Sequence, residues 1–223
     1  MGSTTSSFST YETARILVPG YYFAVLTLML VNLTALTVQW PIVVPDIFMI
    51  FVFVVLGYIA GLTLYAKEST KRRKAFQENQ PSSYLKTKAR AIPDLPVMEE
   101  DEAKQLYFYI LNNHIPSIFH EKIFFFGTIY HIMIQIRRTS LWFSLLGTIL
   151  AMALPLAGYP DSAGLLSFSA AVWLIYLFNV TFNKADRKMQ ENYKDQIYWL
   201  EMNNDLVETI LRKRSQNLSS QRP

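Results

Sequence analysis

The sequence predicts an all-α integral membrane protein, with four transmembrane helices in two hairpins joined to cytoplasmic helices. The first observation is composition: 51% of the 223 residues are hydrophobic, yet the chain has 21 basic and 17 acidic residues. Soluble domains mix apolar and charged residues every few positions, because each helix or strand needs two faces. Here the two kinds of residue are segregated along the chain, and this segregation is the second observation.

The third observation is the length of the uncharged stretches, which are Ile16–Trp40, Ile47–Ala66, Leu141–Tyr159 and Ala163–Asn183. Each is about as long as the roughly 20 residues that a helix needs to cross the hydrocarbon core. A soluble protein can bury one helix of this kind. Four in a chain of this length favour lipid as their surroundings.

Five segments follow from these stretches. We expect an N-terminal tail and interfacial segment (1–15), a first transmembrane hairpin (16–66), a cytoplasmic helical region (67–138), a second hairpin (139–183) and a C-terminal cytoplasmic helix (184–223).

Positive charge beside the spans indicates their orientation. The short connections 41–46 and 158–162 contain neither Lys nor Arg, whereas the other span ends are flanked by Arg15, Lys67, Arg137, Arg138 and Lys184. Basic residues near span ends mark the cytoplasmic face. We therefore expect both termini in the cytoplasm of a bacterial inner membrane.

The segments between the spans give further expectations. Residues 11–20 predict a short interfacial helix that ends at a Pro-Gly pair, and 67–76 predict a basic helical extension of the second span. Three prolines without an apolar period favour a loop over Gln80–Val97. The acidic run Glu99–Glu102 suits a helix N-terminus, and another helix should begin at Pro116.

Ser117–Ile136 is ambiguous. It is rich in Ile, Phe and Tyr and long enough to span, but His120, Glu121, Lys122 and His131 interrupt it. We interpret it as an amphipathic helix that lies on the membrane or packs under the transmembrane bundle. The alternative is a fifth span, which would place the C-terminus outside.

Asp186–Arg214 predicts a long helix with a heptad seam. Its apolar positions and Asn204 are spaced 4, 3, 4, 3 and 4, and a single buried Asn typically fixes register and oligomeric state. The alternative is that the seam packs on the chain's own cytoplasmic helices. The candidate oligomerisation residues are Tyr193, Ile197, Leu200, Asn204, Val207 and Leu211.

Neutral polar and small residues interrupt the spans. Gly57-x-x-x-Gly61 is a close-packing motif for membrane helices. Polar residues in spans often serve helix packing, but they also line pores once copies assemble, and an uncharged pore would be weakly selective or gated by dewetting. The pore-lining candidates are Thr27, Asn32, Thr34, Ser144 and Thr148.

Two basic clusters lie near aromatic residues Phe76 and Tyr84. One interpretation is attraction to anionic lipid, worth about 1 kcal/mol per residue near the surface. The other is capture of an anionic nucleotide or single-stranded oligonucleotide, with the aromatic rings as stacking platforms. The ligand-binding candidates are Lys71, Arg72, Arg73, Lys74, Lys86, Lys88 and Arg90.

Nothing in the sequence indicates catalysis, a cofactor or a metal. The spans contain no ionisable group of the kind that marks intramembrane active sites. The three histidines share one cytoplasmic stretch, and there is no cysteine. We therefore expect that the chain is not an enzyme.

Two features resemble a known class. Residues Glu99–Arg214 run as cytoplasmic helix, tight two-span hairpin and long cytoplasmic helix, and a Tyr11-x-x-x-Arg15-x-x-x-Pro19-Gly20-Tyr21 piece precedes the first span. This layout resembles the SLATT-type two-span effectors and the Hailong-type membrane effectors of bacterial anti-phage systems. The resemblance implies an oligomeric channel that depolarises the membrane, controlled by a nucleic-acid signal from a partner nucleotidyltransferase.

The sequence thus favours a homo-oligomeric gated pore, for example a tetramer, that is controlled by an anionic cytoplasmic ligand and arrests growth. The alternative is a non-conducting membrane anchor that recruits a cytoplasmic partner.

Overall fold

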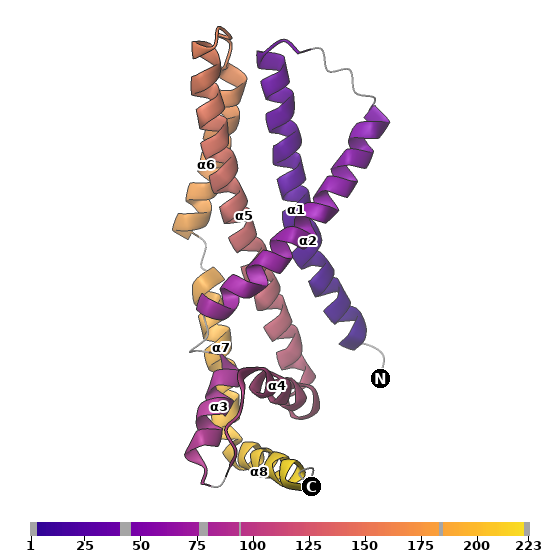
Figure 1. Ribbon diagram of the computed structural model, residues 1–223, viewed down its shortest axis with the longest axis vertical. Helices are drawn as coiled ribbons and strands as arrows, with labels where there is room; N and C mark the ends of the chain where they lie inside the picture. The colour runs from indigo at the N-terminus through magenta and orange to yellow at the C-terminus, as the bar shows by residue number, and fades with distance from the viewer. Residues whose placement is uncertain (1–3, 41–45, 76–79, 94, 183–184, 221–223) are drawn as a thin grey trace. The chain divides into compact units, whose positions relative to one another are not determined.

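The computed structural model describes residues 4–40, 46–75, 80–93, 95–182 and 185–220. In these ranges the chain is helical and contains no strand (Figure 1). The helices are α1 (Thr4–Thr37), α2 (Asp46–Ala75), α3 (Pro81–Ala91), α4 (Glu100–His114), α5 (Ser117–Leu156), α6 (Ala163–Phe182), α7 (Ala185–Met202) and α8 (Asn204–Ser220).

The chain divides into two compact units. Residues 1–70 and 127–185 form the first, which we call the apolar unit. Residues 71–126 and 186–223 form the second, which we call the charged unit. Because α2 and α5 extend past the boundaries at 70/71 and 126/127, each contributes residues to both units.

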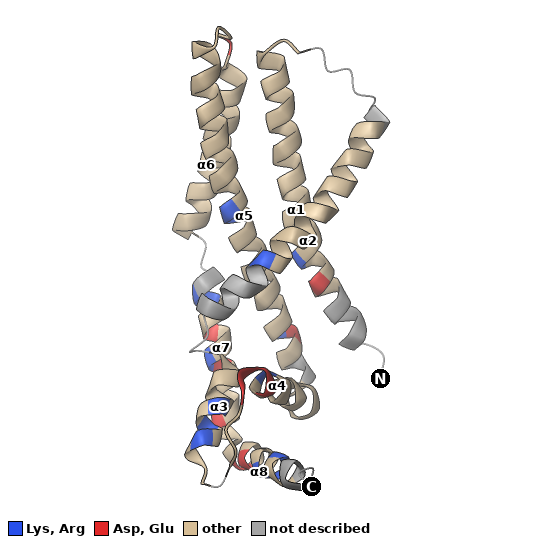
Figure 2. Cartoon of the chain, viewed as in Figure 1, with Lys and Arg blue, Asp and Glu red and all other residues tan. Residues whose placement is uncertain are grey.

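Four helical segments are long and apolar enough to cross a membrane: Thr10–Thr37, Phe48–Lys67, Phe119–Leu156 and Ala163–Met202. Figure 2 shows long stretches of α1, α2, α5 and α6 without a charged side chain. The predictions of an all-helical chain and of four apolar, span-length helices are confirmed.

The core of the apolar unit lies between α1, α5 and α6. In Figure 1, α5 and α6 run side by side in opposite directions. Burying a large aliphatic or aromatic side chain is worth about 1.5–3 kcal/mol in water, whereas helices surrounded by lipid lack this driving force and depend on tight packing. The buried core residues are Leu26, Leu30, Phe143, Ala151, Leu165, Phe168 and Val172.

Helices α1 and α5 end in the same way. At the end of α5 the Tyr159 N–H donates to the Leu154 carbonyl at 3.0 Å, across Gly158 with φ of 94°. At the end of α1 the Trp40 N–H donates to Ala35 at 2.9 Å, across Gln39 with φ of 53°. Both are Schellman-type ends, in which a left-handed residue lets the chain turn away.

Helix α2 meets α1 at the predicted glycine motif. A Cβ added to Gly20 would lie 2.8 Å from the Gly61 Cα and closer still to the Gly57 carbonyl oxygen. One added to Gly61 would meet the Ile16 backbone. The two backbones are therefore in direct contact, which glycine alone permits.

Two expectations about the apolar helices are wrong. Helix α1 does not end at Pro19-Gly20 but continues through Pro19. Proline removes one backbone hydrogen bond and usually kinks or ends a helix. Here Pro19 and Gly20 are buried in the packing of the unit, and such packing lets membrane helices tolerate proline.

Ser117–Ile136 is not a separate helix, so it is neither a fifth span nor a helix that lies by itself on the membrane; whether it packs under the bundle stays a prediction. It is the first half of α5, and no turn separates it from the stretch Leu141–Leu156. A fifth span would require the chain to reverse between the two. Its buried residues Tyr130 and Ile134 pack within the apolar unit.

In the charged unit, the loop expected over Gln80–Val97 is wrong, because α3 occupies Pro81–Ala91. Pro81 stands at the start of this helix, where its missing N–H is harmless and its fixed φ suits the first turn. By contrast, the basic extension of α2 to Ala75, the acidic start of α4 at Glu100 and a helix after Pro116 are confirmed.

The predicted single helix over Asp186–Arg214 is divided into α7 and α8 at Asn203. The Asn203 side-chain amide donates to the Trp199 carbonyl at 2.8 Å, as does the Asn203 backbone N–H at 3.1 Å. Polar side chains that bond their own backbone in this way bend helices.

The heptad seam packs inside the chain. Leu200, Val207 and Leu211 are fully buried in the core of the charged unit, together with residues of α3 and α4. Tyr193 is buried, and Ile197 and Asn204 are half-buried. The alternative interpretation of the seam is therefore the observed one, and most of it is not available to a second copy.

Replacing Gly20 or Gly61 by Ala should destabilise the protein, because a methyl group at either position meets backbone that has no side chain to move aside. Overpacking costs about 1–3 kcal/mol, and each kcal/mol lowers Tm by about 2–4 °C at this chain length. Thermal unfolding in detergent, followed by circular dichroism, measures the change.

Gly164→Ala is the matched control, since the added methyl would meet only the end of the Leu33 side chain at 3.1 Å. It should leave Tm unchanged or raise it. Equal shifts for all three variants would contradict a specific contact between α1 and α2.

Candidate functional site

Buried polar side chains follow one another along α5 on two faces, with Thr128, His131, Gln135 and Thr139 on one face and Ser140 and Ser144 on the other. Their exposed fractions do not exceed 4%. Buried polar groups in an apolar surrounding are costly unless they are hydrogen-bonded, so a row of them is unusual. We call this row, continued by Thr148, the polar track; its buried members among the described residues are Thr128, His131, Gln135, Thr139, Ser140 and Ser144.

One end of the track joins three helices through a charged group. The Tyr65 hydroxyl of α2 donates to Glu12 Oε2 of α1 at 2.6 Å. Arg15 donates to Glu12 Oε1 at 2.7 Å and, through Nε, to Thr128 Oγ1 of α5 at 3.1 Å. We call Glu12, Arg15, Tyr65 and Thr128 the clasp.

The next residues continue the contacts with α2. The His131 ring lies against the Tyr65 ring, with centroids 5.3 Å apart. Gln135 Nε2 donates to the Leu64 carbonyl at 2.8 Å. This part of α5 therefore meets α2 through polar groups.

The other end of the track faces α1 and α6. The Tyr22 hydroxyl lies 2.7 Å from Ser140 Oγ. Thr148 Oγ1 donates to the Ser144 carbonyl at 2.7 Å and lies 2.6 Å from Ser169 Oγ. Trp173 Nε1 donates to Thr148 Oγ1 at 3.2 Å. Hydroxyl groups thus join α5 to both of its neighbours.

The predicted pore-lining residues separate into two groups. Ser144 and Thr148 lie on the polar track. Thr27, Asn32 and Thr34 belong to α1 and do not bond to the track. Each side chain donates instead to the carbonyl four residues earlier in α1, at 2.7–2.9 Å. Asn32 is exposed on the outside of the unit.

Sequence reasoning missed five residues of the track, namely Thr128, His131, Gln135, Thr139 and Ser140. The first three lie in 117–138, which was expected to be cytoplasmic. Polar side chains are common on helices exposed to water, so they did not indicate a buried site there. The available signal was the spacing of 131, 135 and 139, which places three polar groups on one face of an apolar helix.

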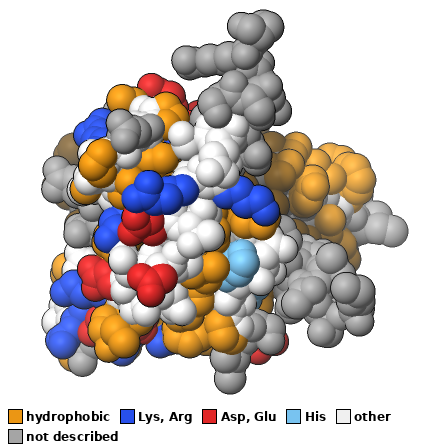
Figure 3. Space-filling view, turned by 90° about the horizontal axis from the view of Figure 1, so that it is seen from below, with side chains coloured by type: hydrophobic (Ala, Val, Ile, Leu, Met, Phe, Trp, Pro, Cys, Tyr) orange, Lys and Arg blue, Asp and Glu red, His pale blue; other side chains and the backbone are white. Residues whose placement is uncertain are grey.

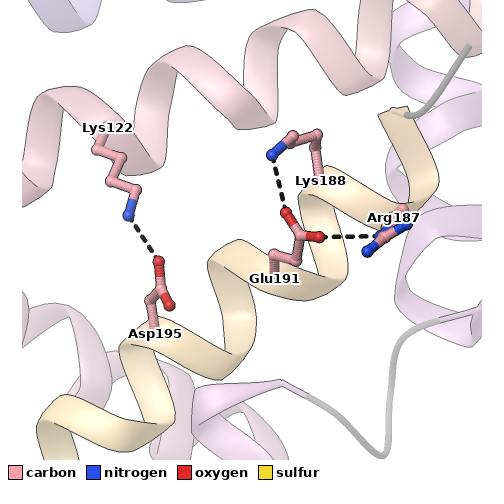
Figure 4. A network of polar contacts seen from close by, with 5 residues as sticks. All are labelled: Lys122, Arg187, Lys188, Glu191 and Asp195. Atoms are coloured by element: carbon pink, nitrogen blue, oxygen red, sulfur yellow. Dashed lines mark hydrogen bonds and ion pairs between the residues drawn. The ribbon is translucent and has the colours of Figure 1, made fainter.

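In the charged unit, ion pairs use many of the basic side chains. Figure 4 shows Lys122 of α5 with Asp195 of α7 at 2.6 Å, and Arg187 and Lys188 on either side of Glu191. Further pairs are Arg214 with Glu102, Lys104 with Glu100, and Arg212 with Glu208. Exposed pairs of this kind contribute little to stability, but they neutralise the charge available to a ligand.

The predicted ligand-binding residues of α3 differ in this respect. Lys86, Lys88 and Arg90 form no ion pair with any residue that the structure describes. Lys71, Arg72, Arg73 and Lys74 belong to the last turns of α2, but their side chains lie outside the described residues. The face in Figure 3 is not uniformly positive, since acidic and basic side chains alternate on it.

Buried amides also occur in the charged unit. The Tyr107 hydroxyl donates to Gln196 Oε1 at 2.5 Å, and burial raises the pKa of Tyr107. Within the ranges given above, no group of three or more His, Asp or Glu side chains is placed to hold a metal ion.

Comparison of the chain with protein-family models, with curated proteins and with solved structures finds no match.

Tyr65→Phe should weaken the clasp, because Glu12 loses a hydrogen bond of 2.6 Å. Removing one partner of a partly buried bond to a charged group costs about 1–3 kcal/mol. Tyr58→Phe is the control on the same helix, since the Tyr58 side chain is 51% exposed. Equal unfolding midpoints for both variants in detergent would argue against the clasp.

The Glu102–Arg214 pair predicts a pH dependence of stability. The hydrogen bond from Arg214 holds the pKa of the Glu102 carboxyl below its usual range. The stabilisation is therefore present above the unfolded pKa of about 4.3 and is lost as pH falls through the lower folded pKa.

Glu102→Gln should reduce the free energy of unfolding by a few tenths to about 1 kcal/mol at neutral pH, since the pair is partly exposed. This difference from the unaltered protein should shrink as pH falls below about 4.3. Glu121→Gln, at an exposed position on α5, should show no such trend. A difference that grows on acidification would refute the assignment.

Proposed function

We propose that the chain is a gated pore of a bacterial inner membrane. The four apolar helices cross the membrane with both termini in the cytoplasm, and copies of the chain assemble. The polar track of α5 supplies the ion path. The observation that carries the proposal is this row of hydroxyl, amide and imidazole groups inside an otherwise apolar unit.

The position of the track along α5 supports this role. Ser140, Ser144 and Thr148 lie in the uncharged part of α5 that follows Arg138, whereas Thr128, His131 and Gln135 precede Arg137 and lie toward the cytoplasmic end. Neutral polar groups in the uncharged part would let a water-filled path replace the hydration of an ion, and the absence of a ring of charge there predicts weak selectivity.

The side chains of the track are buried, so this arrangement corresponds to a closed pore. Opening requires α5 to separate from α1, α2 or α6 along the track. Helix α5 is suited to transmit such a movement, because one unbroken helix of 40 residues contributes to both the charged and the apolar unit.

An anionic cytoplasmic ligand is the proposed signal. Lys86, Lys88 and Arg90 form no ion pair with the described acidic residues, which favours α3 as the binding surface. A nucleotide or single-stranded oligonucleotide fits this chemistry, and anionic lipid is the competing ligand. The resemblance in layout to anti-phage effectors supports growth arrest as the outcome and a nucleotidyltransferase as the partner. The role assigned to the chain includes no catalytic residue.

A second candidate is a non-conducting anchor. It is favoured by exposed aromatic side chains on the charged unit, namely Phe108, Tyr109 and Tyr198, which are 51–62% exposed. Exposed apolar surface of this kind is typical of binding to another protein. An anchor would recruit a partner without changing the membrane potential.

Reconstituted vesicles loaded with a potassium-sensitive dye distinguish the two candidates. We expect ion flux from the unaltered protein, and a lower flux for Thr139→Val, because a buried hydroxyl of the track is lost. One polar group in a membrane is worth about 0.6–1.4 kcal/mol, which is about threefold to tenfold in rate. Thr63→Val is the control, since Thr63 is an exposed threonine of α2 that donates to its own helix at Ile59.

The ligand is tested with a short fluorescent single-stranded oligonucleotide. Replacing Lys86, Lys88 and Arg90 by Gln should weaken binding and reduce the slope of log K against log salt by about 2, at about 0.7 per phosphate contact. Lys194→Gln should change neither. Absence of flux with and without oligonucleotide, together with an unchanged membrane potential in expressing cells, would leave the anchor as the better candidate.

A further inference from the structure

One face of α1 is exposed along most of the apolar stretch. The side chains of Val18, Val25, Met29 and Leu36 are 41–74% exposed, and Asn32 is exposed between the last two. The spacings are 7, 4, 3 and 4 residues. Because successive residues of an α-helix are rotated by about 100°, these five side chains lie within an arc of about 60°. We call them the α1 stripe.

The stripe is not the face that α1 uses inside the unit. The buried residues Leu26 and Leu30 lie about 90–130° around the helix from the stripe, in the core with α5 and α6. A spacing of 4 and 3 is the heptad pattern of helices that pack along a common seam at about 20°. The exposed face of α1 therefore has the pattern of a helix–helix interface, and no helix among the described residues covers it.

Asn32 disfavours lipid as the material that covers this face. Its Nδ2 donates one hydrogen bond, to the Leu28 carbonyl of its own helix at 2.9 Å. The second amide hydrogen and Oδ1 have no partner among the residues that the structure describes. Hydrocarbon offers none, and an unpaired amide in an apolar medium costs several kcal/mol.

We propose that the α1 stripe is the interface with a second copy of this chain, and that the two Asn32 side chains hydrogen-bond to each other across it. Copies of one protein insert in the same orientation, so their α1 helices run parallel and their Asn32 residues lie at the same depth. A carboxamide has both a donor and an acceptor, and so it is complementary to itself across a symmetry axis.

The occupant is a second copy because three features must match at once. The partner must offer an amide or a similar group at the depth of Asn32, an apolar surface with heptad spacing above and below it, and parallel insertion. Another copy meets all three without further assumption. Lipid lacks the hydrogen-bonding group.

This interface takes the place of the one expected from the heptad seam of α7 and α8, most of which is buried inside the charged unit. The inference rests on the proposal that α1 crosses the membrane, but it does not require ion flux. It also leaves the polar track of α5 inside each copy, since the stripe residues are exposed and lie about 90–130° around α1 from Leu26 and Leu30, which face the core.

Cysteine cross-linking tests the interface directly, because the chain contains no cysteine of its own. Single variants Val25→Cys, Met29→Cys and Leu36→Cys are reconstituted at low protein-to-lipid ratio and oxidised. We expect disulfide-linked dimers at these positions. Val31→Cys is the matched control, since Val31 is 50% exposed and adjacent to Asn32, but it faces a shallow apolar groove toward Leu150 and lies off the stripe.

Energy transfer between labelled copies tests the role of Asn32. A hydrogen bond between membrane helices is worth about 0.6–2 kcal/mol, so Asn32→Leu should raise the Kd of association about threefold to thirtyfold. Asn32→Gln retains the carboxamide and should restore most of the affinity. Because Asn32 is exposed, neither change should alter the helical content, which circular dichroism checks.

Cross-linking at Val31 as fast as at Met29 would overturn the inference, as would an absence of dimers at all three stripe positions, which would mean that lipid or a different protein covers this face. The two proposals fail separately. Dimers without flux would refute the pore and leave the interface standing, whereas flux without stripe cross-links would refute the interface and leave the pore.

Discussion

The structure of the apolar unit depends on one constraint, which is that a polar group surrounded by apolar material must find its partner inside the protein. Thr27 and Thr34 satisfy it locally by bonding their own helix. The amide N–H of Gln135 and the hydroxyl of Ser140 satisfy it by joining α5 to its neighbours. The same hydrogen bonds that hold the helices together therefore place a row of polar groups along α5.

The charged unit obeys a different rule, because its helices have one apolar face and one solvated face. Leu85 and Ala89 of α3, Ile110 and Leu111 of α4, and Leu200 of α7 form a core from which charges are excluded. The ion pairs lie at its surface. As a result the positive groups of α3 stand out because none of the described acidic side chains lies within pairing distance of them, rather than because of their number.

Much of the fold could be predicted from the sequence, and the errors have physical causes. Uncharged runs define the apolar helices, and Gly57 and Gly61 predicted close helix packing because small residues let membrane helices approach; that the partner is α1 came from the structure. Pro19 and Pro81 led to wrong predictions of a helix end and of a loop, since the effect of proline depends on whether it stands at a helix start or in packed surroundings.

The seam around Leu200 correctly predicted a helix–helix interface. It did not show whether the partner surface belongs to the same chain or to a second copy, because periodicity contains no information about partners. The polar track was missed for a related reason: burial of His131 and Gln135 follows from tertiary packing.

The crossing of α1 and α2 at Gly20, Gly57 and Gly61 has a mechanical consequence. Backbone lies on backbone there, so the two helices can tilt about this point, and the stacked rings of Tyr21 and Phe53 and the bond from Tyr65 to Glu12 limit the tilt on either side. The Phe48 end of α2 is about 15–20 Å from this point along the helix. A swing of about 10° would carry that end through about 3 Å, while the glycine contact itself hardly changed. Leverage of this kind turns a slight tilt at one end of a helix into a displacement comparable to the width of a water molecule at the other.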